Sequence, residues 1–238
     1  MLNQATYWIE VAAAVTDALL LLRIVLLKLP RTYLFITLVA VLAVFFDVVA
    51  LWLGVQSQES GRVFFYSRFL YAFLYPAAAW EVFEEVGTEL GKLRRTAVFR
   101  MVSSLLMALI FGLVFAAFAD TGEDSGGQAT LAMVGIVLWA ASSVASVAFL
   151  WTIHKVIKSQ KIPLPNNTFV WLIYFELFLA AEVAACLFAI AAPLVNTAFA
   201  DVVDMVVNVY GIAITLWCVW RLKAAASGVP SAPEKASL

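Results

Sequence analysis

Seven long apolar stretches follow one another along the chain, separated by short polar connectors. A bilayer core of ~30 Å requires roughly 20 apolar residues in helical conformation. The pattern therefore predicts an all-α, polytopic seven-helix membrane bundle over residues 1–222. The predicted spans are 6–27, 32–54, 63–84, 97–118, 129–153, 168–192 and 197–221. Residues 223–238 are rich in Ser, Pro and Ala, and we expect a disordered tail because they bury too little surface to fold.

Composition argues against an ordinary soluble domain. Apolar residues make up 64% of the 238 positions and charged residues only 13%, whereas a typical soluble domain is about 25% charged. The formal net charge of −1 argues against nucleic acid as a partner. We therefore expect the lipid bilayer to be the main partner, with other membrane subunits as a second candidate.

Basic residues fall on one side of the predicted membrane. Thirteen of the 15 Lys and Arg residues flank the connectors after the first, third and fifth spans or follow the seventh. Because basic loops remain cytoplasmic, we expect the N-terminus outside the cell membrane and the C-terminus in the cytoplasm. That orientation requires an odd number of spans, which agrees with seven.

Acidic residues are unusually frequent inside the predicted spans. An ionised group there costs ~2.5–3.5 kcal/mol on insertion scales, so each one requires a partner or a function. The depth along each helix places Asp17 and Glu176 toward mid-membrane, and Asp47, Glu182, Asp201 and Asp204 in the outer half.

Arg68 is the one basic residue predicted at outer-half depth. It can pair with one or two of Asp47, Asp201 and Asp204, which lie at a similar depth. The remaining acids are then expected to be protonated, hydrated or bound to a cation, because an unpaired carboxylate is unstable at low dielectric.

The seventh span has a polar face. Its polar or small residues recur at intervals of 3 and 4, at Asp201, Asp204, Asn208, Gly211, Thr215 and Cys218. This spacing places them on one side of a helix. We predict an outward-opening polar cavity bounded by the first, second, third, sixth and seventh spans. Its candidate proton- or ligand-binding residues are Asp17, Asp47, Arg68, Glu176, Glu182, Asp201, Asp204 and Asn208. The alternative is that these groups form interhelical bonds that only fix packing.

Enzymatic and metal chemistry is not expected. The chain lacks a G-x-S-x-G sequence, an H-E-x-x-H sequence and a Gly-rich phosphate loop. One histidine and two distant cysteines exclude haem, zinc and copper centres, so no cofactor is predicted. Glu81, Glu84 and Glu85, at the inner end of the third span, are expected to be solvated and to meet nearby basic side chains.

The third and seventh spans resemble those of microbial rhodopsins. Pro76 followed by Glu81 resembles that family's proline and inner-side proton donor, Arg68 resembles its arginine, and Asp204 matches its second counter-ion. The resemblance implies a seven-helix, rhodopsin-like fold.

The chain departs from the rhodopsin pattern at three places. Arg68 stands one residue too close to the proline, and Leu70 or Tyr71 falls where the counter-ion carboxylate belongs. Asn208 stands where the family's D-x-x-x-K pattern places the retinal-binding lysine. Covalent retinal binding is therefore excluded, and the resemblance implies a lysine-less relative.

Two classes of function remain from the sequence. The first is a proton-linked carrier or a ligand- or pH-responsive module. The second is a non-catalytic structural or accessory subunit of a larger membrane complex, which would explain the short connectors and the apolar fourth span.

Overall fold

The computed structural model describes residues 2–54, 57–87, 93–118, 127–191 and 197–224. These residues form seven α-helices and one short 3-10 helix, with no β-strand among them. The elements are α1 (Leu2–Leu26), η1 (Leu29–Arg31), α2 (Leu34–Leu53), α3 (Gln58–Gly87), α4 (Leu93–Phe118), α5 (Gly127–Gln160), α6 (Asn166–Ala191) and α7 (Thr197–Arg221). Each predicted span coincides with one helix. Most of the predicted tail, from residue 225 onward, lies outside the described residues.

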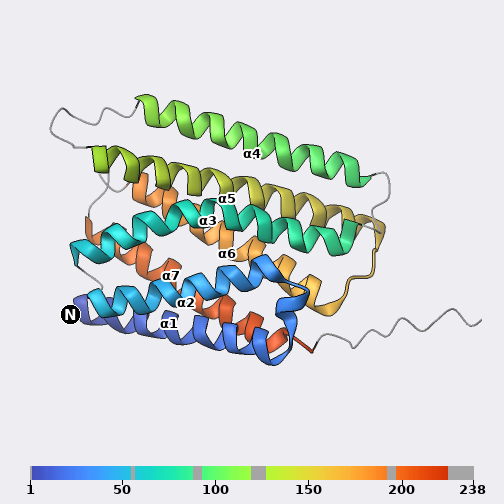
Figure 1. Cartoon of the computed structure of the whole chain (residues 1–238), viewed down its shortest axis with the longest axis horizontal. Helices are drawn as coiled ribbons and strands as arrows, with labels where there is room; N and C mark the ends of the chain where they lie inside the picture. The colour runs from blue at the N-terminus through green and yellow to red at the C-terminus, as the bar shows by residue number, and fades with distance from the viewer. Residues whose placement is uncertain (1, 55–56, 88–92, 119–126, 192–196, 225–238) are drawn as a thin grey trace, which may run out of the picture.

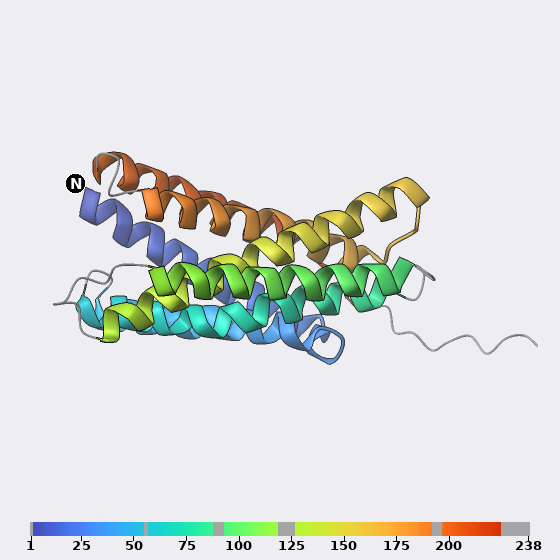
Figure 2. The same cartoon turned by 90° about the horizontal axis from the view of Figure 1, so that it is seen from above.

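The helices run along the long axis of the molecule and alternate in direction (Figure 1). One end of the bundle, here called the N-terminal end, carries the start of α1, and the C-terminal end carries the end of α7. Six helices close a ring in the order α1, α2, α3, α5, α6 and α7, and α3 also touches α6 across it. Helix α4 packs against α5 on the outside of this ring (Figures 1 and 2).

Small residues let α3 and α5 approach closely. A Cβ atom at Gly135 of α5 would lie 2.7 Å from the ring of Phe69 on α3, so a larger residue there would force the ring to move. Ser142, Ala145 and Ser146 of α5 are also buried. The two serine hydroxyls donate hydrogen bonds to backbone carbonyls of their own helix, which satisfies them without a partner helix.

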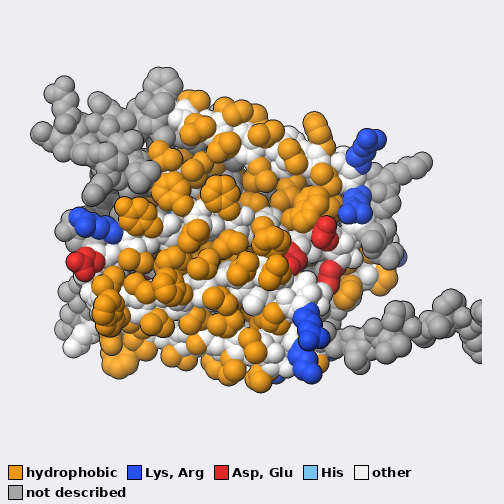
Figure 3. Space-filling view, viewed as in Figure 1, with side chains coloured by type: hydrophobic (Ala, Val, Ile, Leu, Met, Phe, Trp, Pro, Cys, Tyr) orange, Lys and Arg blue, Asp and Glu red, His pale blue; other side chains and the backbone are white. Residues whose placement is uncertain are grey.

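The exterior of the bundle is apolar between its charged ends (Figure 3). Every helix exposes large hydrophobic side chains, and Trp52 on α2 and Phe73 on α3 are 83% and 73% exposed. Soluble monomers rarely expose continuous apolar surfaces of this extent. Among the described residues, the segments Leu34–Leu53, Val134–Gln160 and Asn166–Ala185 are long and apolar enough to cross a membrane. These features indicate a membrane location.

A hydrophobic core fills much of the C-terminal half of the ring. Ile24 of α1, Phe83 of α3 and Leu172 of α6 are completely buried there and belong to one hydrophobic cluster. Trp171 of α6 is also completely buried and belongs to the same cluster.

Two carboxylates at the C-terminal end of α3 are held by hydrogen-bond donors. Glu81 accepts hydrogen bonds from the backbone N–H groups of the first three residues of α2, including Phe35 at 3.2 Å and Ile36 at 3.0 Å. Glu85 accepts from the hydroxyl of Tyr33, at 2.7 Å, and from the hydroxyl of Thr168. Neither forms a salt bridge within the described part of the chain. Among the described residues, these two carboxylates therefore meet backbone N–H groups and hydroxyls in place of the expected basic side chains; Lys92, one of the expected partners, lies outside the described residues.

Candidate functional site

A cavity of about 370 Å³ lies inside the ring and is lined by α1, α2, α3, α6 and α7. These are the five segments that the sequence predicted around a cavity. Its lining along α1 extends from Glu10 to Leu20, about 15 Å at the helical rise of ~1.5 Å per residue. Ser60 and Gly61, near the start of α3, also line it, so the cavity begins near the N-terminal end of the bundle.

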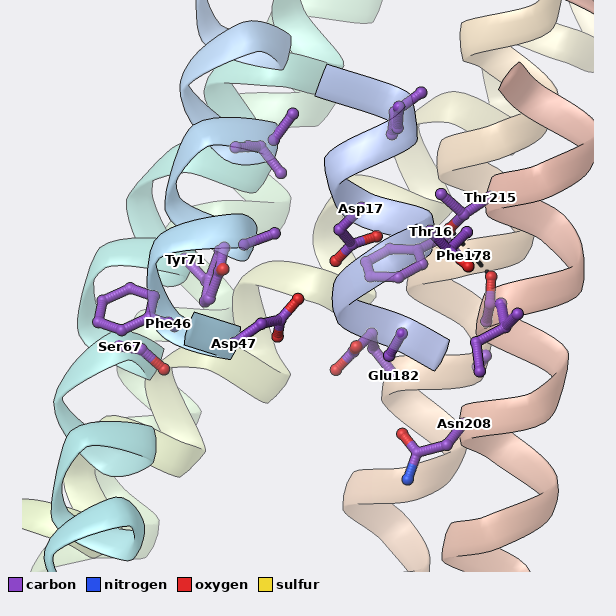
Figure 4. A pocket seen from close by; sticks show the side chains of 18 of the residues that line it. Thr16, Asp17, Phe46, Asp47, Ser67, Tyr71, Phe178, Glu182, Asn208 and Thr215 are labelled. Carbon is purple, nitrogen blue, oxygen red and sulfur yellow. Dashed lines mark hydrogen bonds between the residues drawn. The ribbon is translucent and has the colours of Figure 1, made fainter. Parts of the chain in front are cut away.

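Acidic groups outnumber basic groups in the described lining. Glu10, Asp17, Asp47 and Glu182 supply four carboxyl groups, and Arg68 supplies the one basic side chain. These residues come from α1, α2, α3 and α6, so the excess of acid is built by the tertiary structure and not by one helix. Figure 4 shows the carboxyl groups of Asp17, Asp47 and Glu182 around the cavity.

Arg68 forms an ion pair with Glu182. Its Nη1 atom lies 3.5 Å from Oε2 of Glu182, and the two side chains are only 13% and 20% exposed. The guanidinium also lies over the ring of Phe64 at 3.8 Å and over the ring of Trp139 at 4.1 Å. These contacts direct the arginine toward α6. The prediction offered Asp47, Asp201 and Asp204 as partners and not Glu182; the side chains of Asp201 and Asp204 lie outside the described residues.

Asp17 and Asp47 lie against each other without a basic partner. Their carboxyl groups point toward one another from α1 and α2, and both residues line the cavity (Figure 4). Neither forms a salt bridge with any described residue. The Oδ2 atom of Asp47 is buried and has no hydrogen-bond partner in the described part of the chain. This carboxyl pair therefore combines burial with an unfilled acceptor.

A continuous aromatic wall lines the same cavity. Its five members are Phe46 of α2, Tyr71 and Tyr75 of α3, and Tyr174 and Phe178 of α6. The ring centroids of Phe46 and Tyr71 are 6.0 Å apart, and Tyr71 stacks on Tyr75 at 5.2 Å. Tyr75 meets Phe178 edge-to-face at 6.2 Å, and Phe178 stacks on Tyr174 at 5.5 Å.

The polar face of α7 also reaches the cavity. Asn208, Gly211 and Thr215 line it, as their spacing predicted. The hydroxyl of Thr215 donates a hydrogen bond of 2.9 Å to the carbonyl of Gly211. Asp201 and Asp204 lie on α7, but their side chains are outside the described residues. Of the eight candidate residues, the structure thus brings together Asp17, Asp47, Arg68, Glu182 and Asn208.

Glu176 does not belong to this cavity. Its carboxylate lies 2.8 Å from Nδ1 of His154, between α6 and α5, and the residue is not part of the cavity lining. Six positions separate Glu176 from Glu182, so at ~100° per residue the two side chains point in directions about 120° apart around α6. The prediction used the depth of Glu176 along the helix and not its direction around it.

The sequence contained a signal for the aromatic wall that the prediction missed. Arg68, Tyr71 and Tyr75 are spaced 3 and 4 residues apart, and Tyr174, Phe178 and Glu182 are spaced 4 and 4. Each set shares one helix face with a charged cavity residue. Aromatic side chains at that spacing are also common in apolar cores, so the pattern became informative only when the cavity was seen.

Comparisons of the chain with protein-family models, with curated proteins and with solved structures find no match. The fold and the site nevertheless define a class. The chain is an all-helical protein with an apolar exterior and an acidic, aromatic-lined internal cavity. Its function is inferred from that cavity.

Proposed function

We propose that the protein is a seven-helix protein of the cell membrane that acts as a proton-linked carrier, or as a ligand- or pH-responsive module, through an outward-facing cavity. The orientation is supported by the basic residues exposed at the C-terminal end of the bundle, where α1 meets α2, α4 begins, and α5 and α7 end. The positive-inside rule places that end in the cytoplasm. The cavity then opens outward, and the hydrophobic core of the C-terminal half faces the cytoplasm.

The observation that carries this proposal is the Asp17–Asp47 pair. Two carboxylates in contact at low dielectric cannot both remain ionised without a counter-charge. Arg68 is the one basic side chain in the described lining, and its ion pair is with Glu182 and not with the aspartates. The pair must therefore share a proton or hold a cation, and exchange of one for the other would link proton movement to ligand binding.

Proton flux into liposomes tests this function directly. The purified protein is reconstituted with a pH-sensitive dye inside the vesicles, and a pH gradient is imposed. We expect Asp17→Asn and Asp47→Asn to abolish the protein-dependent signal. Glu84→Gln is the matched control, because Glu84 is an exposed carboxylate outside the cavity. Equal flux in the wild type and both aspartate variants would refute a role for the pair.

An accessory-subunit function is the second candidate, and the position of α4 favours it. This helix lies outside the ring and exposes apolar residues such as Phe99, at 72%, and Ile110, at 53%. Such a face can pack against another membrane protein as well as against lipid. A purified chain with no proton signal, together with a stable complex of defined stoichiometry that dissociates on substitution of Phe99, would favour this function over a carrier.

The proposal also includes a protein that shares the seven-helix topology of the rhodopsins but lacks their retinal-binding lysine. Asn208, which stands where that family's lysine would be, lines the cavity. A retinal placed there would find no amine on α7 with which to form a Schiff base. Added retinal should therefore leave no covalently bound pigment after denaturation and extraction with organic solvent.

A further inference from the structure

The aromatic wall is larger than proton binding alone requires. A proton relay needs carboxyl groups and water, whereas this cavity places five aromatic rings, each in contact with another of the five, beside its acids. A volume of about 370 Å³ is equivalent to roughly a dozen water molecules at ~30 Å³ each. It falls within the range of ~300–1,000 Å³ that is typical of small-molecule sites. The space therefore suits an organic ligand and not an unaccompanied ion.

The charge balance indicates a ligand with one positive charge. Arg68 and Glu182 neutralise each other across 3.5 Å, which leaves the Asp17–Asp47 pair as the unneutralised group. When the two carboxyl groups share one proton, the pair carries a single negative charge. Glu10, at the upper end of the cavity, adds negative potential that attracts cations toward the site.

The contacts do not suit a divalent metal ion. Calcium takes six to eight oxygen ligands and magnesium requires octahedral coordination. No group of three or more His, Cys, Asp or Glu side chains among the described residues is arranged to hold a metal. An ammonium group, by contrast, needs only one carboxylate and gains further from ring faces, since those faces carry negative charge density.

We propose that the cavity binds an organic monocation, a protonated or quaternary amine with an apolar body. The charged nitrogen lies at the Asp17–Asp47 pair, where Oδ2 of Asp47 offers its unfilled acceptor. The apolar body lies along the aromatic wall, whose Phe46 and Tyr71 rings lie together on one side of Asp47 in Figure 4. This inference rests on the proposed function, because it names the ligand class of the same cavity.

Binding to the purified protein in detergent tests the ligand class without any transport step. The probes are 2-phenylethylammonium, its neutral isostere 2-phenylethanol, the anion phenylacetate, and sodium chloride, each measured by calorimetry. We expect the ammonium to bind at least tenfold more tightly than the alcohol, and phenylacetate and sodium not to bind. Equal affinity for the ammonium and the alcohol, or displacement of the ammonium by sodium at similar concentration, would overturn the inference.

Two variants separate the contribution of the carboxylate charge to ligand binding from the contribution of the aromatic wall. Asp47→Asn should weaken binding of 2-phenylethylammonium at least tenfold and leave the affinity for the alcohol unchanged. Tyr71→Leu keeps every carboxylate and should weaken the ammonium about threefold to tenfold, so it remains a test even if Asp47→Asn does not fold. Glu84→Gln should bind as the wild type does. Unchanged ammonium affinity in Tyr71→Leu would refute the role of the wall.

A permanently charged probe tests independently in which direction the affinity changes with pH. Phenyltrimethylammonium cannot lose its charge, so any pH dependence of its affinity reports the protein. Because protons compete with it for the carboxyl pair, its affinity should rise as pH rises, and this dependence should be lost in Asp47→Asn. An affinity that falls as pH rises would contradict the site.

The proton-flux and amine-binding experiments test the proposed function and the ligand class separately. Proton flux without amine binding would refute the organic-cation ligand and leave the proposed carrier intact. Amine binding without proton flux would support the ligand class and reject proton-linked carriage.

Discussion

At the C-terminal end of the ring, Glu81 and Glu85 accept hydrogen bonds from backbone N–H groups and hydroxyls, whereas inside the cavity Asp17 and Asp47 face each other. All four are carboxylic acids within one helical bundle. The difference lies in the donors around them. The start of α2 presents three free N–H groups to Glu81, which also meets the positive end of the helix dipole. The middle of α1 and α2 presents none, because those N–H groups are already used within the helices.

This contrast separates acids that hold the fold together from acids that are available for a ligand. A carboxylate whose lone pairs accept several hydrogen bonds contributes to stability and has few acceptor sites left for a cation. A carboxylate facing another carboxylate gains from binding either. Substitutions in the two regions should therefore change different measured quantities.

The largest effect on stability is expected from Glu81→Ala. The substitution leaves the three N–H groups at the start of α2 without their acceptor, and we expect a loss of about 3 kcal/mol in the free energy of unfolding. Denaturant titration in mixed micelles measures it. Because Glu81 lies outside the cavity lining, amine binding at low denaturant should be unchanged. A stability equal to the wild type would show that the hydrogen bonds of Glu81 are not structurally important.

A smaller loss is expected from Arg68→Met. The methionine keeps the contact with Phe64 and Trp139 but leaves Glu182 without its ion pair. Because both side chains are partly exposed, we expect about 2 kcal/mol, below the cost of breaking a fully buried pair. The double variant with Glu182→Gln should recover most of this loss, since no uncompensated charge remains. Additive losses in the double variant would argue against the pair.

Asp47→Asn should change the free energy of unfolding in the opposite direction to Glu81→Ala and Arg68→Met. It removes the mutual repulsion of the carboxyl pair, so we expect the free energy of unfolding to stay constant or to rise by about 0.5–1 kcal/mol. The same variant should lose proton flux. This gain of stability with a loss of function is the sharpest expected difference from Glu81→Ala. A destabilisation above about 2 kcal/mol would place Asp47 among the structural acids.

The smallest effect is expected from Glu176→Gln. An amide can still accept the hydrogen bond from His154, so only the charge of the pair is lost, and we expect about 0.5–1 kcal/mol of destabilisation. Amine binding and proton flux should remain at wild-type levels, because the residue does not line the cavity. Loss of either signal would bring Glu176 back into the functional site.

Periodicity along single helices was enough to predict part of this site. The spacing of Asn208, Gly211 and Thr215 identified the inner face of α7, and the structure places all three in the cavity. The excess of acids over bases at one depth indicated a polar interior. Both inferences depend only on the rise and turn of one helix, which the sequence determines locally.

Pairing between helices could not be predicted in the same way. Arg68 meets Glu182 and not Asp47 because its guanidinium is held between rings of α3 and α5. Glu176 meets His154 because α6 turns that side chain toward α5. Each contact depends on how two helices are rotated against each other, and depth along one helix contains no information about that rotation.

The amino-acid sequence by itself determined the all-helical class, the apolar exterior and the number of acidic residues available to a buried cavity, since these follow from composition and local periodicity. Only the tertiary structure decided which acids are saturated by donors and which face one another. The physical reason is that hydrogen-bond donors, ring faces and counter-charges reach a carboxylate from other helices. Their positions are set by the packing of the ring.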